Sequence, residues 1–185
     1  MLLINLAYRS RFVETNRLQI MKKFKLLISF VFTISIANSQ NTPFKIFIEP
    51  ITIENLGGLQ SYAFGQANGK WLIVGGRLDG LHRRQPFAAF DVAGNNNQLI
   101  VVDPVAKQKW TMPISSLPIA VQEQLSSTNM QFHQTGNFLY ITGGYGYNNA
   151  TSTRKTFNNL TAIDVPATIN AVINGLSIST YFRQI

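Results

Sequence analysis

Two short apolar segments of the chain each end at a pair of glycines. The first is residues 70–76, Lys-Trp-Leu-Ile-Val-Gly-Gly, and the second is residues 137–144, Asn-Phe-Leu-Tyr-Ile-Thr-Gly-Gly. Both are rich in β-branched and aromatic residues, and glycines bound them too closely for a helix, so each predicts a β-strand. Paired glycines at a strand end fit a positive φ or the close approach of another segment. The chain is therefore expected to contain one strand-forming unit twice.

Each glycine doublet is followed by a polar loop and then by a strand that ends in aspartate, at residues 99–103 and 160–164. In the first unit, residues 71–74 are all apolar, which favours a strand covered on both faces. We expect four antiparallel strands between residues 61 and 112, with the second unit built the same way. The expected strands are 61–65, 71–74, 98–103 and 107–112, then 130–133, 138–142 and 159–164.

The order of these signals resembles a kelch repeat of a β-propeller. The first unit has Gly75 and Gly76, then Asp103 and Trp110; the second keeps Gly143, Gly144 and Asp164 but has no tryptophan in the equivalent place. The doublets lie 68 residues apart and the aspartates 61 apart. Kelch repeats are nearer ~50 residues, so these units carry loop insertions. The resemblance covers about residues 57–170 and implies an all-β fold: a kelch-like propeller fragment of about two four-stranded antiparallel blades.

The N-terminal region predicts export. Residues 21–39 have three lysines at 22, 23 and 25, an apolar stretch at 26–36, and small residues at Ala37 and Ser39. This order is typical of a secretory signal peptide cleaved before Gln40, and it places the protein in the periplasm, at the cell surface or outside the cell. The alternative is an uncleaved anchor or core helix, the one expected membrane contact. Residues 1–20 are interpreted as an upstream extension, with translation starting at Met21.

The remainder divides into a lead-in strand or linker at 40–60, a first blade at 61–112, a connecting segment at 113–129 with a short helix near 118–125, and a second, incomplete blade at 130–185. The tail at 180–185 is expected to start a further blade. Since a propeller typically needs four to eight blades, the chain is interpreted as an N-terminal piece of a longer protein. Its runs 71–74 and 139–142 would each be half covered, and it would not form a stable monomer alone.

Charge and cysteine content exclude some functions. The net charge is +8, but residues 1–39 hold six basic residues against one acidic, while residues 40–185 hold ten against seven. Much of the excess therefore belongs to the targeting segment, and no nucleic-acid partner is expected. The chain has no cysteine. It therefore has no disulfide, and the two histidines, His82 and His133, lack metal-ligand spacing.

Strand alternation places the three long connections, 77–97, 113–129 and 145–158, at one end of the sheets, where binding usually occurs. The first connection holds five candidate ligand residues, which are Arg77, Asp79, His82, Arg83 and Arg84. The arginines could hold a carboxylate or phosphate, or they could pair with Asp79 and nearby carbonyls. Tyr145 and Tyr147 in the third connection could stack on a sugar or pack over the loop.

These observations predict a non-enzymatic binding or interaction module for a protein or glycan, with no cofactor and no identifiable catalytic residue. The alternative is a propeller enzyme acting on a sugar. Kelch-like propellers include galactose oxidase relatives and sialic acid mutarotases. The oxidase chemistry needs a cysteine–tyrosine crosslink, which this chain cannot form. A mutarotase-like activity remains the open enzymatic alternative, since fold analogy alone does not assign function.

Overall fold

A computed structural model describes residues 21–26, 44–80 and 89–185 of the chain. The chain divides into two units, residues 1–49 and 50–185. In the first unit, residues 21–26 are helical, whereas residues 1–20 and most of the predicted signal segment lie outside the described part. Phe44, Ile46 and Ile48 are exposed and belong to no strand, so the lead-in strand expected around them is not formed. No helix within the described ranges is long and apolar enough to cross a membrane.

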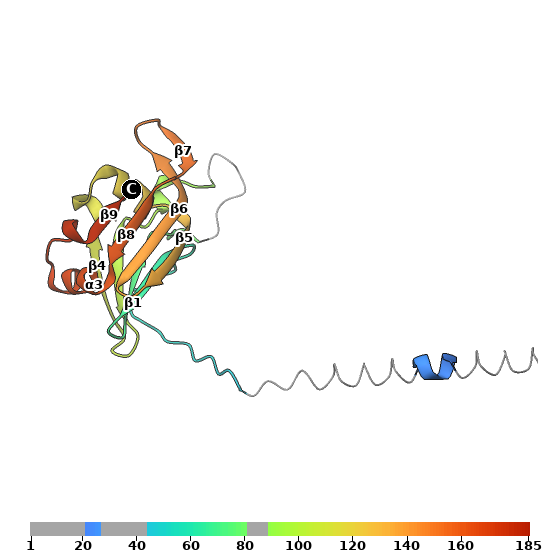
Figure 1. The fold of residues 1–185 in the computed structure, drawn as a ribbon. Coiled ribbons are helices and arrows are strands. Elements are labelled where there is room, and N and C mark those ends of the chain that lie inside the picture. Colours follow the sequence, from blue (N-terminus) through green and yellow to red (C-terminus); the bar gives the residue numbers. More distant parts are fainter. Residues whose placement is uncertain (1–20, 27–43, 81–88) are drawn as a thin grey trace, which may run out of the picture. The chain divides into compact units, whose positions relative to one another are not determined.

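The first sheet of the second unit has four antiparallel strands in sequence order (Figure 1). They are β1 (Ala63–Ala67), β2 (Lys70–Val74), β3 (Gln98–Asp103) and β4 (Gln108–Pro113). All four strands predicted for the first unit are therefore present. The first strand begins two residues later than predicted, because the β1–β2 turn consists of only two residues. These are Asn68 and Gly69, which both have positive φ.

The second sheet has five antiparallel strands. They are β5 (Thr128–Thr135), β6 (Phe138–Asn148), β7 (Thr153–Thr156), β8 (Leu160–Asp164) and β9 (Phe182–Gln184). Four of them follow the order β5-β6-β8-β9, and β7 pairs with the far half of β6. The expectation that the tail starts a further unit was wrong, because β9 pairs with β8 and completes this sheet.

The two sheets share one register. In the first sheet Phe64 faces Ile73, and in the second Phe132 faces Ile141, each 68 positions later. The next pairing repeats as well: Leu72 faces Val101, and Tyr140 faces Ala162. The spacings of 68 and 61 residues in the sequence are thus the spacings of the structural repeat. In the fourth strand, Arg183 occupies the place that Trp110 has in the first sheet.

Helical segments fill the connections. They are η2 (Val92–Gly94), η3 (Ile114–Ser116), α2 (Ile119–Leu125), α3 (Val165–Asn174) and η4 (Ser179–Tyr181). The sequence predicts α2 but we did not expect α3, although Asp164 caps it by accepting a hydrogen bond from Ala167 N (3.1 Å) and Gly175 ends it at φ 66°. The connection between β8 and β9 is therefore a helix, whereas the matching connection between β3 and β4 in the first sheet is a short turn.

A hydrophobic core lies between the two sheets. The first sheet contributes one face, which includes Leu72, Val74, Leu99 and Val101. The second sheet contributes the face that carries Leu139, Ile141 and Ile163, and both helices add apolar side chains. Trp110 is half-buried against this core. Burial of many fully enclosed apolar side chains at about 1.5–3 kcal/mol each makes this core the main stabilising feature.

The two outward faces differ. Ile73, Ile100 and Val102 of the first sheet are covered by Ile53, Leu56 and Leu59 from the irregular segment before β1. The expectation that the run 71–74 is covered on one face only was wrong, because Leu72, Ile73 and Val74 are all buried. The outward face of the second sheet exposes Phe138, Tyr140 and Leu160, so the run 139–142 is indeed covered on one side only.

Both glycine doublets have the predicted positive φ, at 65° and 85° for Gly75 and Gly76 and at 70° and 91° for Gly143 and Gly144. They lie on either side of the segment that joins the sheets. A Cβ at Gly75 would come within 2.8 Å of Ser127 O, and one at Gly144 within 2.1 Å of Ser127 Oγ. The doublets therefore let both β2 and β6 approach the joining segment more closely than any side chain would allow.

Candidate functional site

The three long connections meet at one end of the stacked sheets, as strand alternation predicts. Arg154 of β7 donates two hydrogen bonds to Phe90 O, at 3.0 and 2.8 Å. The Phe90 ring lies edge-on to Tyr145 with 5.1 Å between ring centroids. Glu123 of α2 accepts hydrogen bonds from the start of the β6–β7 hairpin. These contacts join the first, second and third connections to one another.

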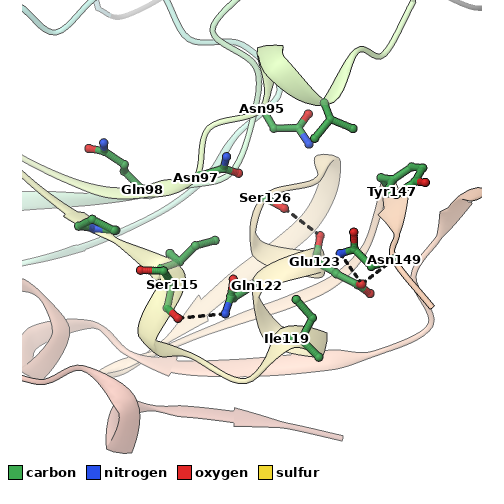
Figure 2. A pocket seen from close by; sticks show the side chains of 13 residues that line it. Asn95, Asn97, Gln98, Ser115, Ile119, Gln122, Glu123, Ser126, Tyr147 and Asn149 are labelled. Carbon is green, nitrogen blue, oxygen red and sulfur yellow. Dashed lines mark hydrogen bonds between the residues drawn. The ribbon is translucent and has the colours of Figure 1, made fainter. Parts of the chain in front are cut away.

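A pocket of about 390 Å³ lies among these connections (Figure 2). Its walls come from the end of the first connection, from the segment 113–126 and from the β6–β7 hairpin. The lining is rich in amides and contains one carboxylate and one tyrosine. The polar lining residues are Asn95, Asn97, Gln98, Ser115, Gln122, Glu123, Ser126, Tyr147 and Asn149.

Local hydrogen bonds position each wall. Asn96 is buried; its Nδ2 donates to Gly75 O (3.0 Å), and its Oδ1 accepts from Gln98 N (3.1 Å). This anchor ties the residues beside it to the glycine doublet. On the opposite wall, Gln122 Nε2 donates to Ser115 O (3.1 Å) and to Leu117 O (2.6 Å), which fixes α2 against η3. The pocket therefore rests on anchored backbone.

Glu123 is the one carboxylate among the described lining residues, and it is buried. Its Oε1 accepts from Asn149 N (2.8 Å) and Asn149 Nδ2 (2.9 Å), and its Oε2 accepts from Asn148 Nδ2 (2.7 Å). Burial raises the pKa of Glu123, but these hydrogen bonds together with the charge of Lys155 outweigh it, so the net pKa lies below its ordinary value of 4.5. Glu123 is thus an ionised brace for the hairpin.

Several lining groups have hydrogen-bonding capacity that the protein does not use. Within residues 44–80 and 89–185, the side chains of Asn97 and Gln98 and the hydroxyl of Tyr147 form no hydrogen bond with protein groups. Gln122 uses its amide nitrogen internally and leaves its oxygen as an acceptor. The pocket therefore presents both donors and acceptors to a ligand.

Arg77, a predicted ligand residue, is committed to the fold instead. Arg77 is 2% exposed, and its side chain holds Asp79 in a two-point ion pair, with Nε–Oδ1 2.9 Å and Nη2–Oδ2 2.5 Å. It also donates to Asn95 Oδ1 (3.0 Å) and Asp91 O (2.9 Å). The interpretation in which arginines pair with Asp79 and nearby carbonyls is therefore the observed one for Arg77. His82, Arg83 and Arg84 lie outside the described residues.

The two tyrosines predicted as ligand residues have different roles in the structure. Tyr145 packs against Phe90, over which Arg77 also lies at 5.7 Å from the ring centroid, so Tyr145 has a packing role. Tyr147 lines the pocket. Sequence reasoning missed the amides at 95–98 and the pair Gln122 and Glu123. Four consecutive amide residues ending a long connection were the available signal for the first group.

The repeated aspartates have a shared structural role. Asp103 Oδ1 accepts hydrogen bonds from Val105 N (3.0 Å) and Ala106 N (2.8 Å), and its Oδ2 pairs with Lys70 Nζ (3.0 Å). The backbone hydrogen bond from Ala106 is the main cause that holds the pKa of Asp103 below its ordinary value, and the side-chain hydrogen bond from Lys70 is the second. Asp164 accepts from Ala167 N in the same way. Each aspartate therefore caps the segment that follows its strand, which is a turn after β3 and helix α3 after β8.

No group of three metal-ligating side chains occurs in the part of the chain that the structure describes. A scan against protein-family models finds no match for the chain, and a search of curated proteins finds no similar sequence. The fold and the pocket are therefore the basis for a functional assignment.

Proposed function

We propose that the protein is an exported binding module of kelch-like propeller construction, with no catalytic role. Three features support the propeller interpretation. The four-strand register is repeated, the sheets stack face to face, and each unit carries a positive-φ glycine doublet and a turn-capping aspartate. The outward face of the second sheet exposes Phe138, Tyr140 and Leu160, which is consistent with the packing of a further unit of the same kind against it.

The polar pocket is the proposed ligand site. The observation that carries this proposal is the convergence of three long connections from a rigid two-sheet scaffold on one pocket. In it, the side-chain amides of Asn97 and Gln98 and the hydroxyl of Tyr147 form no hydrogen bond with the described residues. Loops held by a rigid scaffold are where binding residues concentrate. The pocket volume lies within the usual range of about 300–1,000 Å³ for small-molecule sites.

A sugar-modifying enzyme of mutarotase-like type is the competing proposal, and Glu123 argues against it at this site. A general acid needs a pKa raised toward the working pH. The pKa of Glu123 is lowered, and three hydrogen-bond donors already occupy its oxygens. The group that would most naturally perform proton transfer is instead a structural anion.

Ligand-observed NMR on the exported chain tests the binding proposal. The screen would contain neutral sugars, acidic sugars and short peptides, and each hit would be repeated with Gln98→Ala and Tyr147→Ala proteins. We expect at least one class to bind and to lose its signal in both variants. If every hit binds the variants as well as the native chain, the pocket is not the ligand site.

Export is tested separately. The basic, apolar and small-residue segments at 21–39 support cleavage after Ser39. N-terminal sequencing of the secreted or periplasmic product should begin at Gln40. A mature chain that still carries residues 26–36 would replace the export proposal with an anchored one.

A further inference from the structure

The unused groups of the pocket define a particular kind of ligand. A primary amide carries two N–H donors and a carbonyl acceptor, and a tyrosine hydroxyl donates and accepts. Asn97, Gln98 and Tyr147 present such groups to the pocket, and Gln122 adds an acceptor. A sugar hydroxyl also donates and accepts, so a hydroxyl-rich molecule can satisfy this set in several orientations. A simple anion would satisfy the donors alone and would leave the acceptors unpaired.

Apolar surface accompanies these polar groups. Tyr147 lies on the hairpin wall and Ile119 on the α2 wall, with Glu123 and Asn149 between them in the view and with Asn97 and Gln98 on the other side of it (Figure 2). Ile119 is 59% exposed although it is a large apolar residue at the first position of a helix. Sugar rings combine hydroxyl edges with C–H faces. An exposed aliphatic and an aromatic side chain beside amides are suited to both kinds of surface.

The charge of the pocket points away from anionic ligands. The described lining residues include no lysine or arginine, whereas phosphate and carboxylate sites usually use paired arginines or lysines. Glu123, the one charged group among the described lining residues, is negative and already accepts three hydrogen bonds. An acidic ligand would meet this buried carboxylate, and Lys155, the described cation that acts on Glu123, does not line the pocket.

We infer that the pocket binds a neutral saccharide, of a few sugar rings at most, through amide–hydroxyl hydrogen bonds and contact with Tyr147 and Ile119. This inference rests on the proposed function, because it names the ligand class of the same site. The volume of about 390 Å³ lies near the small end of ligand pockets, which sets the limit on size.

Isothermal titration calorimetry on the exported chain tests the inference. The probes are maltose, cellobiose and N,N′-diacetylchitobiose as neutral sugars, with glucuronic acid and inorganic phosphate as anions. We expect a neutral disaccharide to bind with a micromolar to millimolar dissociation constant. Gln98→Ala and Tyr147→Phe should each weaken it about threefold to tenfold, as expected for the loss of one ligand hydrogen bond. Tyr147→Ala, which also removes the ring, should weaken it more.

Tyr140→Ala is the matched control, since Tyr140 is a tyrosine of the same sheet that lies on its exposed outward face and does not line the pocket. It should leave the affinity unchanged, and circular dichroism would show that every variant folds. If an anion binds and the pocket variants weaken it, the site stands and the saccharide inference falls. If no neutral sugar binds, or if the substitutions at Gln98 and Tyr147 leave sugar binding unchanged, the saccharide inference is wrong. If these substitutions leave the binding of every probe unchanged, the pocket is not the ligand site either.

Discussion

The two sheets are built on the same register, yet they differ in what covers them. In the first sheet, Leu72 and Val101 face the core and are fully buried, and a separate apolar segment covers the opposite face. At the matched positions of the second sheet, Tyr140 is 38% exposed and faces solvent beside Ala162. Repeated backbone hydrogen bonding therefore does not impose repeated burial. The side chain at each position follows the cover that its sheet face receives.

The loop ends of the two sheets also differ at matched positions. Arg77 and Tyr145 lie 68 residues apart and occupy equivalent pairings, with Gln60 and Thr128. Both pack against Phe90, one as a buried cation and the other as a ring. The same repeat position is thus occupied by different residue types in the two sheets, and both contact the loop that contains Phe90. The kelch-like repeat pattern therefore does not indicate which loop side chains pack within the fold and which are available to a ligand.

The largest expected difference is between Leu72→Ala and Tyr140→Ala. Leu72 is fully enclosed, so its truncation leaves a cavity and should lower the free energy of unfolding by about 2–5 kcal/mol. Tyr140 has solvent on one side, and its loss should cost less than about 1 kcal/mol. Urea denaturation of both variants measures the two values. Equal losses would show that the outward face of the second sheet is covered in solution.

A smaller difference is expected between the glycine doublets. Gly75→Ala adds a Cβ against backbone oxygens at 2.8 and 2.9 Å and forces a positive φ, which should cost about 2–4 kcal/mol. Gly143→Ala meets no atom within 4 Å and pays for φ alone, about 1–2 kcal/mol. Thermal unfolding of the two proteins compares them. A milder effect at Gly75 would mean that β2 does not approach the joining segment as closely as described.

The smallest expected effect concerns Glu123 and pH. Because the pKa of Glu123 is lowered by folding, its stabilising contribution is present above the ordinary value of 4.5 and is lost as pH falls below that value. Glu123→Gln should therefore lower stability by about 1–2 kcal/mol at neutral pH. The gap between the two proteins should close below about pH 4.5 in a series of thermal melts. Glu54→Gln, at an exposed position, is the control, and a gap that widens in acid would contradict the bracing role.

Much of the fold could be predicted because its strands have recognisable local sequence patterns. Apolar β-branched runs that end at glycine doublets mark β2 and β6, and the spacing of 68 residues is the true repeat. The helix α3 also had local signals, an N-cap at Asp164 and a left-handed glycine at 175. The prediction that the tail starts a further blade was wrong because α3 carries the chain back to β8, where β9 pairs.

The pocket could be predicted only in part. Long connections at one end were visible in the sequence, and Tyr147 was among the candidates. Gln122 and Glu123, however, are indistinguishable in sequence from the solvated polar face of an ordinary helix. Their meeting with Asn95 and Asn97 depends on how the second sheet stacks on the first, which the core residues decide and no local pattern shows.

Hydroxyl-radical footprinting by mass spectrometry, with and without the neutral disaccharide that binds most tightly, tests the central claim most directly. Without ligand, Tyr140, Phe138 and Ile119 should be oxidised, while Leu72 and Leu99 should be protected. With ligand, oxidation should fall at Ile119 and Tyr147, and it should be unchanged at Tyr140 and Phe138. Protection of Tyr140 and Phe138 with no change at Tyr147 would contradict the account, because the ligand would then lie on the bare sheet face and not in the loop pocket.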